Sequence, residues 1–121
     1  MSGAQRAWPV RLTAAADADF RQILAWTSSR FGGKLARTYG ETLSAALRAL
    51  TAGPTITGVQ ARDDIGKGTY TLHVARQGRR GRHFVVFRVG RVSDHGVIEV
   101  LRLLHDSMDL QRHLRSDKEH G

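Results

Sequence analysis

The chain has 121 residues, which suits one domain with a core that buries roughly two-thirds of the chain's surface. It carries 19 basic and 11 acidic residues, a formal net charge of +8, and no cysteine. These values exclude a disulfide scaffold, a thiolate nucleophile and a cysteine zinc site. No apolar run approaches the roughly 20 residues of a membrane helix, and the start lacks an apolar signal segment. We therefore expect a cytoplasmic protein without a membrane partner, which binds something acidic.

The first half of the chain predicts a short strand followed by two helices. The alternating residues 10–12 form the strand, and Thr13 is suited to cap a helix that Gly32-Gly33 ends. A second helix is predicted over residues 34–51, and so short a link favours an antiparallel hairpin. Apolar residues at helical spacing would face the core. In the two helices these are Ala16, Phe20, Ile23, Leu24, Thr27 and Phe31, then Leu35, Tyr39, Leu43, Ala46, Leu47 and Leu50.

The second half predicts three strands. Residues 53–68 are rich in glycine and indicate a loop. Period-two patterns then predict strands over 70–74, 83–89 and 97–104, and the short turns between them favour an antiparallel meander. A last helical turn is predicted over 109–114. The fold class is therefore α+β, in the order β-α-α-β-β-β, with the antiparallel helical hairpin packed on a small, mostly antiparallel four-stranded sheet.

The last predicted strand is apolar at nearly every position, so both of its faces need cover. Two helices cover only one face of the sheet. The pattern predicts either a partner chain or an exposed apolar patch, unless the C-terminal segment folds back over the strand.

The strongest chemical signal is a stretch without acidic residues, from Ile65 to Ser93. Its bases are Lys67, Arg76, Arg79, Arg80, Arg82, Arg88 and Arg91. Guanidinium groups bind phosphate or carboxylate in a bidentate manner, so the stretch indicates a site for nucleic acid or an acidic protein segment. The alternative is a solvated turn with no binding role.

Other catalytic patterns are weak. The histidines are dispersed, with none paired four residues apart, so we expect no metal site. No phosphate-binding glycine loop occurs, and no cofactor is expected. His105 ends the last strand, where a histidine can act as an acid or base near pH 7 or can hold the C-terminal turn to the sheet.

The segment Arg102-Leu103-Leu104-His105-Asp106-Ser107-Met108-Asp109, followed by Arg112-His113-Leu114, resembles the C-terminal signature of ParE-type toxins. These belong to the ParE/RelE superfamily of bacterial type II toxin–antitoxin systems. Three other stretches are similar to the family: Leu12-Thr13 with the helix to Phe31-Gly32, Arg62-Asp63-Asp64 to Gly68, and His83 to Val89. The resemblance covers residues 10–114, which we take as the domain, with 1–9 as an N-terminal extension and 115–121 as a polar tail.

The resemblance implies a growth-inhibiting toxin that a cognate antitoxin neutralises, the antitoxin itself binding operator DNA. ParE toxins are associated with inhibition of DNA gyrase, whereas RelE relatives cut messenger RNA on the ribosome. The lysines of the RelE type are absent, which favours a gyrase inhibitor that acts by binding. We expect Arg76, Arg79, Arg80, Arg82, Arg88 and Arg102 to bind antitoxin or target.

Two alternatives stay open at this point. The first is a ribosome-dependent endoribonuclease with Arg88, Arg102 and His105 as its catalytic residues. The second is a non-toxic module that binds nucleic acid. Loss of toxicity on replacing His105 would indicate the ribonuclease, and no toxicity at all would indicate the module.

Overall fold

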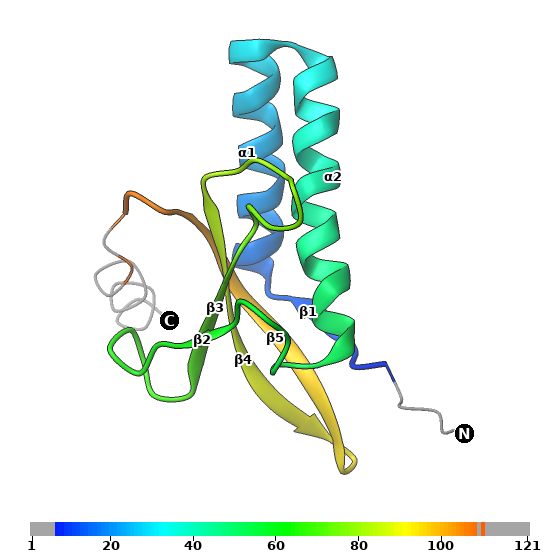
Figure 1. Ribbon diagram of the computed structural model, residues 1–121, viewed down its shortest axis with the longest axis vertical. Coiled ribbons are helices and arrows are strands. Elements are labelled where there is room, and N and C mark those ends of the chain that lie inside the picture. Colours follow the sequence, from blue (N-terminus) through cyan, green and yellow to red (C-terminus); the bar gives the residue numbers. More distant parts are fainter. Residues whose placement is uncertain (1–6, 109, 111–121) are drawn as a thin grey trace.

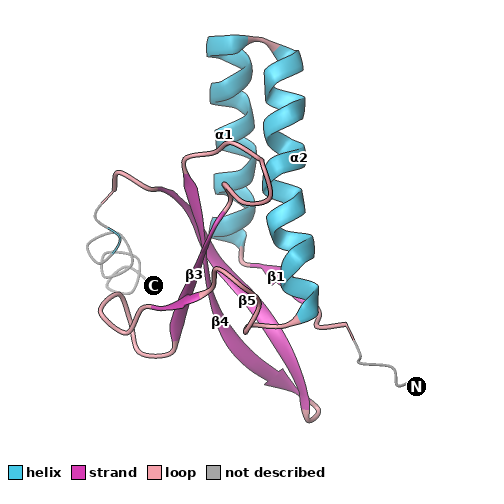
Figure 2. Cartoon of the chain, viewed as in Figure 1, coloured by secondary structure: helices cyan, strands magenta, loops and turns pink. Residues whose placement is uncertain are grey.

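The computed structural model describes residues 7–108 and 110, in which two helices lie against one face of a five-stranded sheet (Figures 1 and 2). The helices are α1 (Ala14–Phe31) and α2 (Gly33–Ala49), followed by a 3-10 turn, η1 (Leu50–Ala52). The strands are β1 (Val10–Leu12), β2 (Gln60–Ala61), β3 (Thr69–His73), β4 (His83–Val92) and β5 (His95–His105). Their order in the sheet is β1-β5-β4-β3-β2, with β1 parallel to β5 and the other neighbours antiparallel. The predicted α+β class is confirmed.

The helical hairpin forms for the reasons that the sequence suggests. Thr13 Oγ1 accepts a hydrogen bond from the amide of Ala16 at 3.1 Å, which is an N-cap. Gly32 ends α1 with a φ of 93°, a left-handed conformation that favours glycine, and α2 begins at the next residue. Neither helix combines the length and the apolar character of a membrane span, within the residues described.

Two features of the sheet differ from the prediction. The sheet has five strands rather than four, because Gln60 and Ala61 pair with β3 inside the predicted loop. Both residues are exposed and carry no apolar alternation, so the sequence gives no signal for β2. The turn predicted around residues 90–96 is also shorter. β4 and β5 continue to Ser93 and Asp94, whose φ values of 49° and 67° suit a two-residue hairpin turn.

The tip of the helical hairpin is exposed, contrary to the predicted faces. Phe31 and Leu35 were expected in the core, but their exposed fractions are 58% and 52%. The cause is length: 18 residues of α1 span roughly 27 Å, and the hairpin extends beyond the sheet at the upper end of Figure 1. Trp26 is 56% exposed beside Phe31, with the two rings 5.8 Å apart.

The main core lies between the hairpin and the sheet, and a smaller one lies on the other face. Leu43, Leu50, Phe87 and Ile98 are fully buried in the first. On the other face, Leu104 and Val86 are buried against two residues from outside the sheet, Ile65 and Leu110. The expectation that β5 lacks cover on its second face is therefore wrong: no large apolar residue of β5 is exposed. The terminal helical turn predicted over 109–114 lies outside the described residues, apart from Leu110, as does the polar tail.

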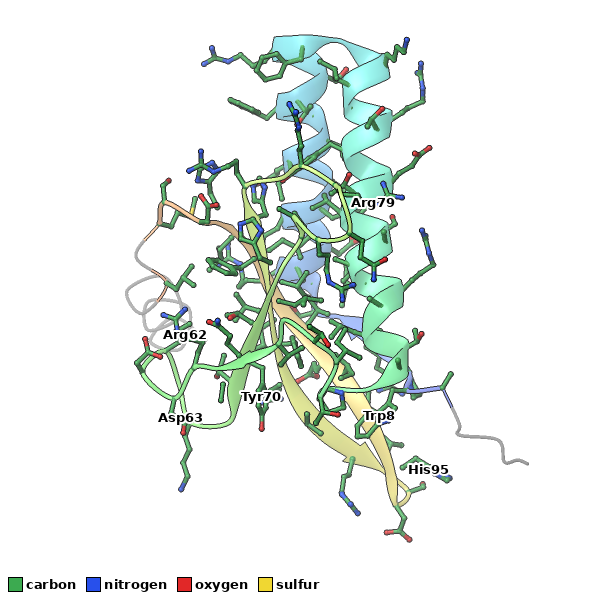
Figure 3. All side chains as sticks on the ribbon, in the orientation of Figure 1. Trp8, Arg62, Asp63, Tyr70, Arg79 and His95 are labelled. Carbon is green, nitrogen blue, oxygen red and sulfur yellow. The ribbon has the colours of Figure 1, made fainter. Side chains whose placement is uncertain are left out.

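Trp8 fastens the start of the described chain to the main core (Figure 3). Its amide donates to the carbonyl of Thr51 at 2.8 Å. A Cβ atom at Gly96 would lie 2.1 Å from the indole ring, so the ring can rest there only because residue 96 has no side chain.

A buried carboxylate joins α1 to the free edge of β5. β1 pairs with β5 only at Ile98–Val100, so the next residues of β5 have no strand on that side. The Asp19 carboxylate accepts from the Leu103 amide at 2.9 Å and from Arg102 Nε at 2.7 Å and its terminal nitrogen at 3.0 Å. Thr13 completes the contact: its amide donates to the carbonyl of Val100 and its hydroxyl to that of Leu101. The backbone hydrogen-bonding groups at this edge of β5 are thus paired with α1 and its N-cap rather than with another strand.

Replacing Asp19 by alanine should therefore destabilise the chain by about 2–4 kcal/mol, because a partly buried guanidinium and a buried amide both lose the carboxylate to which they donate. Urea unfolding measures this value. Asp17→Ala is the matched control: Asp17 pairs with Arg21 on the surface, and its loss should cost less than about 0.5 kcal/mol. Equal effects of the two changes would contradict the role given to Asp19.

Candidate functional site

A groove of about 750 Å³ runs along the side of α1 to the ends of β4 and β5. One wall is apolar and comes from α1, where Ile23, Trp26 and Phe31 contribute. The other wall is polar and comes from the sheet and its loops. The lining residues are Gln22, Ile23, Trp26, Thr27, Phe31, Tyr39, Arg80, Gly81, Arg82, His83, His105, Ser107 and Met108.

His83 lies in this wall as a neutral hydrogen-bond acceptor. Antiparallel pairing sets it opposite His105, with the two rings 5.3 Å apart. Burial, followed by the neighbouring His105, lowers the pKa of His83 to about 4. The Tyr39 hydroxyl lies 2.6 Å from Nδ1 and accepts from the Arg82 amide at 3.0 Å; in the tautomer with the proton on Nε2, His83 Nδ1 accepts from this hydroxyl. One tyrosine thus links α2 to β4.

The Asp106 carboxylate binds two side chains, Arg82 and His73, at the end of the groove. Arg82 donates to its carboxylate at 2.9 Å, and His73 Nε2 lies 2.9 Å from it. These hydrogen bonds, that of Arg82 first, lower the pKa of Asp106 to about 2. The Asp106 amide also donates to the Arg82 carbonyl at 2.7 Å. The ends of β3, β4 and β5 are therefore tied together around one carboxylate.

His105 is held by the residues that follow it. Its Nδ1 lies 2.7 Å from Ser107 Oγ and accepts from the Ser107 amide at 3.2 Å. With Nδ1 accepting, Nε2 carries the proton of the neutral ring. The side chain keeps 35% of its surface exposed and lines the groove. This geometry suits a turn-anchoring histidine and also leaves the ring accessible.

The predicted arginines fall into two groups. Four have partners: Arg76 with the carbonyl of Thr57, Arg82 with Asp106, Arg88 with Glu99, and Arg102 with Asp19. Arg79 and Arg80 are exposed, and neither guanidinium has a hydrogen bond or ion pair with the residues that the structure describes. Of these two, Arg80 lines the groove, and Arg79 precedes it in the chain.

The three residues of the ribonuclease alternative are not brought together. His105 pairs with His83, and Arg88 lies five residues further along β4, roughly 17 Å away at the rise of a strand. An odd separation also puts Arg88 on the opposite face of the sheet from His83. Arg102 is only 19% exposed and is bound to Asp19. Arg88 and Arg102 therefore do not join His105 in the cluster that this alternative assumed for phosphoryl transfer.

Four residues of the groove network were not predicted as site residues: Tyr39, His73, His83 and Asp106. Helical spacing placed Tyr39 on the core face, and nothing in the pattern marks its hydroxyl. His83 could have been found, because it begins a strand whose antiparallel neighbour ends at His105. In the described residues, no group of three or more histidines and carboxylates is arranged to hold a metal ion.

Comparison with known proteins identifies the family. Residues 10–110 match the family described as "ParE toxin of type II toxin-antitoxin system, parDE". The chain belongs to the ParE toxin family. It is 30% identical over 106 residues to Toxin ParE1 of Caulobacter vibrioides, a match that covers 88% of this chain and 97% of that protein. Membership of this family implies a cognate antitoxin as a partner.

A solved structure shares the fold of this ParE toxin. The YoeB/ParE toxin from Agrobacterium tumefaciens superposes with a TM-score of 0.54 at 15% identity, over 80% of this chain and 96% of that one. At this identity the likeness concerns the fold alone.

The neutral His83 predicts a pH dependence of stability. The unfolded chain protonates this histidine near its ordinary pKa of 6.5, whereas the folded chain does so only near 4. Between pH 6.5 and pH 4 the unfolded chain therefore binds up to one more proton than the folded chain, so the free energy of unfolding should fall as the pH drops through this window. Urea unfolding at stepped pH should show a smaller decrease in this window for His83→Gln than for the wild type. Equal decreases would contradict the role given to His83.

Proposed function

We propose that this ParE toxin inhibits growth by binding DNA gyrase, without catalysis of its own, and that its cognate antitoxin neutralises it. Membership of the ParE family supports a target of this kind. The observation that carries the proposal is the exposed apolar tip of the helical hairpin. Trp26, Phe31 and Leu35 each keep more than half of their surface exposed there. Exposed aromatic and aliphatic side chains of this size are typical of a surface that binds protein.

The surroundings of the tip support a binding role. Arg30 lies over the Trp26 ring, 5.4 Å from its centre, and Lys34 follows on α2. A basic rim around aromatic anchors is the composition of many protein-binding surfaces. The dispersal of Arg88, Arg102 and His105 supports a mechanism by binding. We place the toxin in the cytoplasm, where gyrase acts, and the antitoxin as its link to operator DNA.

A ribosome-dependent ribonuclease is the second candidate, and one observation favours it. His105 and His83 face each other in a groove that also contains Arg80 and Arg82. A histidine with an accessible ring beside arginines can move a proton at a phosphodiester. The function would then depend on His105, which the gyrase proposal does not require.

Supercoiling inhibition should separate these functions. Leu35→Ser and Trp26→Ala should each weaken inhibition of gyrase by the purified toxin at least tenfold, because they remove anchors from the exposed tip. His105→Ala should stay within about threefold of the wild type. The measurement is the toxin concentration that halves supercoiling of relaxed plasmid.

A ribosomal mRNA cleavage assay with the same proteins provides the opposing result. Cleavage by the wild type, loss of cleavage in His105→Ala and unaffected supercoiling would overturn the gyrase proposal in favour of the ribonuclease. Activity in neither assay, together with no growth inhibition, would contradict both toxin functions and favour a non-toxic module that binds nucleic acid.

A further inference from the structure

Residues 75–82, between β3 and β4, form an exposed loop whose shape is fixed by hydrogen bonds; we call it the arginine loop. Its amides at Arg76 and Arg79 donate to the carbonyls of Val74 and Arg76 at 3.0 and 3.1 Å. Arg76 reaches across to the carbonyl of Thr57 at 3.3 Å. Gln77 and Gly78 turn the chain with positive φ values of 52° and 80°. Arg79 lies on this loop in Figure 3.

The end of the arginine loop is fixed against α2. A Cβ atom at Gly81 would lie 2.4 Å from Val74 Cγ2 and 3.1 Å from Tyr39 Oη, so the backbone can approach only with glycine there. The next amide, that of Arg82, donates to the same Tyr39 hydroxyl. The loop therefore holds Arg80 in the lining of the groove and keeps Arg79 next to it in the chain.

Charge and apolar surface meet at this place. The cations further along, Arg82, Arg88 and Arg102, each have a carboxylate partner in the chain. Arg79 and Arg80 have none among the described residues, and one wall of the adjoining groove carries Ile23, Trp26 and Phe31. A ligand that complements both features has an apolar face and at least one carboxylate. An amphipathic protein segment has this chemistry.

We propose that the groove binds an amphipathic, acidic segment of the cognate antitoxin, and that Arg79 and Arg80 select the cognate antitoxin by pairing with its carboxylates. The inference rests on the proposed neutralisation by an antitoxin and names the toxin residues that would recognise the antitoxin. An antitoxin with a neutral or basic residue at that point would leave two guanidinium groups unpaired or repelled, which is how charge patterns reject wrong partners. Trp26 and Phe31 belong to both the groove and the hairpin tip, so the same segment would cover the surface proposed for gyrase.

A charge reversal tests this inference. The double variant Arg79→Glu/Arg80→Glu should bind the purified antitoxin of the same system at least 30-fold more weakly than the wild type by calorimetry. The matched control is Arg11→Glu/Arg91→Glu, with the same change of charge at exposed positions outside the groove; it should stay within about threefold. Urea unfolding of both variants confirms that they are folded.

Rescue identifies the contact. Antitoxin variants in which single acidic residues are replaced by lysine should include one that binds Arg79→Glu/Arg80→Glu at least tenfold better than the unchanged antitoxin does. Wild-type affinity in the loop variant, equal losses in both double variants, or no rescue by any single reversal would overturn the assignment. Gyrase inhibition is measured on the wild-type toxin alone, so failure of the target proposal gives a different result from failure of this one.

Discussion

The fold depends on the contact between one carboxylate and the edge of a strand. Asp19 lies on the second turn of α1 and is 9% exposed. Its carboxylate accepts hydrogen bonds from the Arg102 guanidinium and the Leu103 amide. A buried carboxylate is expensive unless it is paired and hydrogen-bonded, and here both conditions are met by one segment of β5. The same contact closes an edge that β1 is too short to cover. It therefore fixes the position of α1 relative to the sheet, and everything further along the hairpin follows from that position.

The groove is a consequence of this arrangement. α1 contacts β5 at Asp19 and continues past the sheet, so that residues of α1 from Gln22 onward line the groove beside the strand ends. The strand ends in turn are held by Asp106, and the arginine loop is held by Tyr39. An apolar wall on a helix and a cationic wall on the sheet thus meet at defined positions. Under the proposed function, in which this surface binds a target and is covered by the antitoxin, walls held by such contacts would need little ordering on binding.

Much of the fold can be predicted from the sequence, because helical spacing, the Gly32-Gly33 link and three alternating strands each carry a local signal. The exceptions have local causes too. β2 consists of Gln60 and Ala61, which show no apolar alternation. Phe31 was placed in the core because helical spacing does not show where a helix extends beyond its sheet. The site is harder to predict, because its partners lie far apart in the chain. The arginines are visible in the sequence, but only the structure shows that Asp19, 83 residues away in the chain, neutralises Arg102. The antiparallel pairing of the two predicted strands would have placed His83 opposite His105. Nothing in the sequence around Tyr39 indicates that its hydroxyl contacts His83.

The central claim is that Asp19 holds α1 on the edge of β5, and amide hydrogen exchange at Leu103 tests it most directly. In the wild type this amide donates to a buried carboxylate, so it should exchange only through global unfolding and should be as protected as the core of β4. In Asp19→Asn, the weaker neutral acceptor should raise exchange at Leu103 at least tenfold, while Val85 and Phe87 in β4 keep the protection that the variant's global stability allows. Leu103 protection that falls only in step with Val85 and Phe87 would contradict the account.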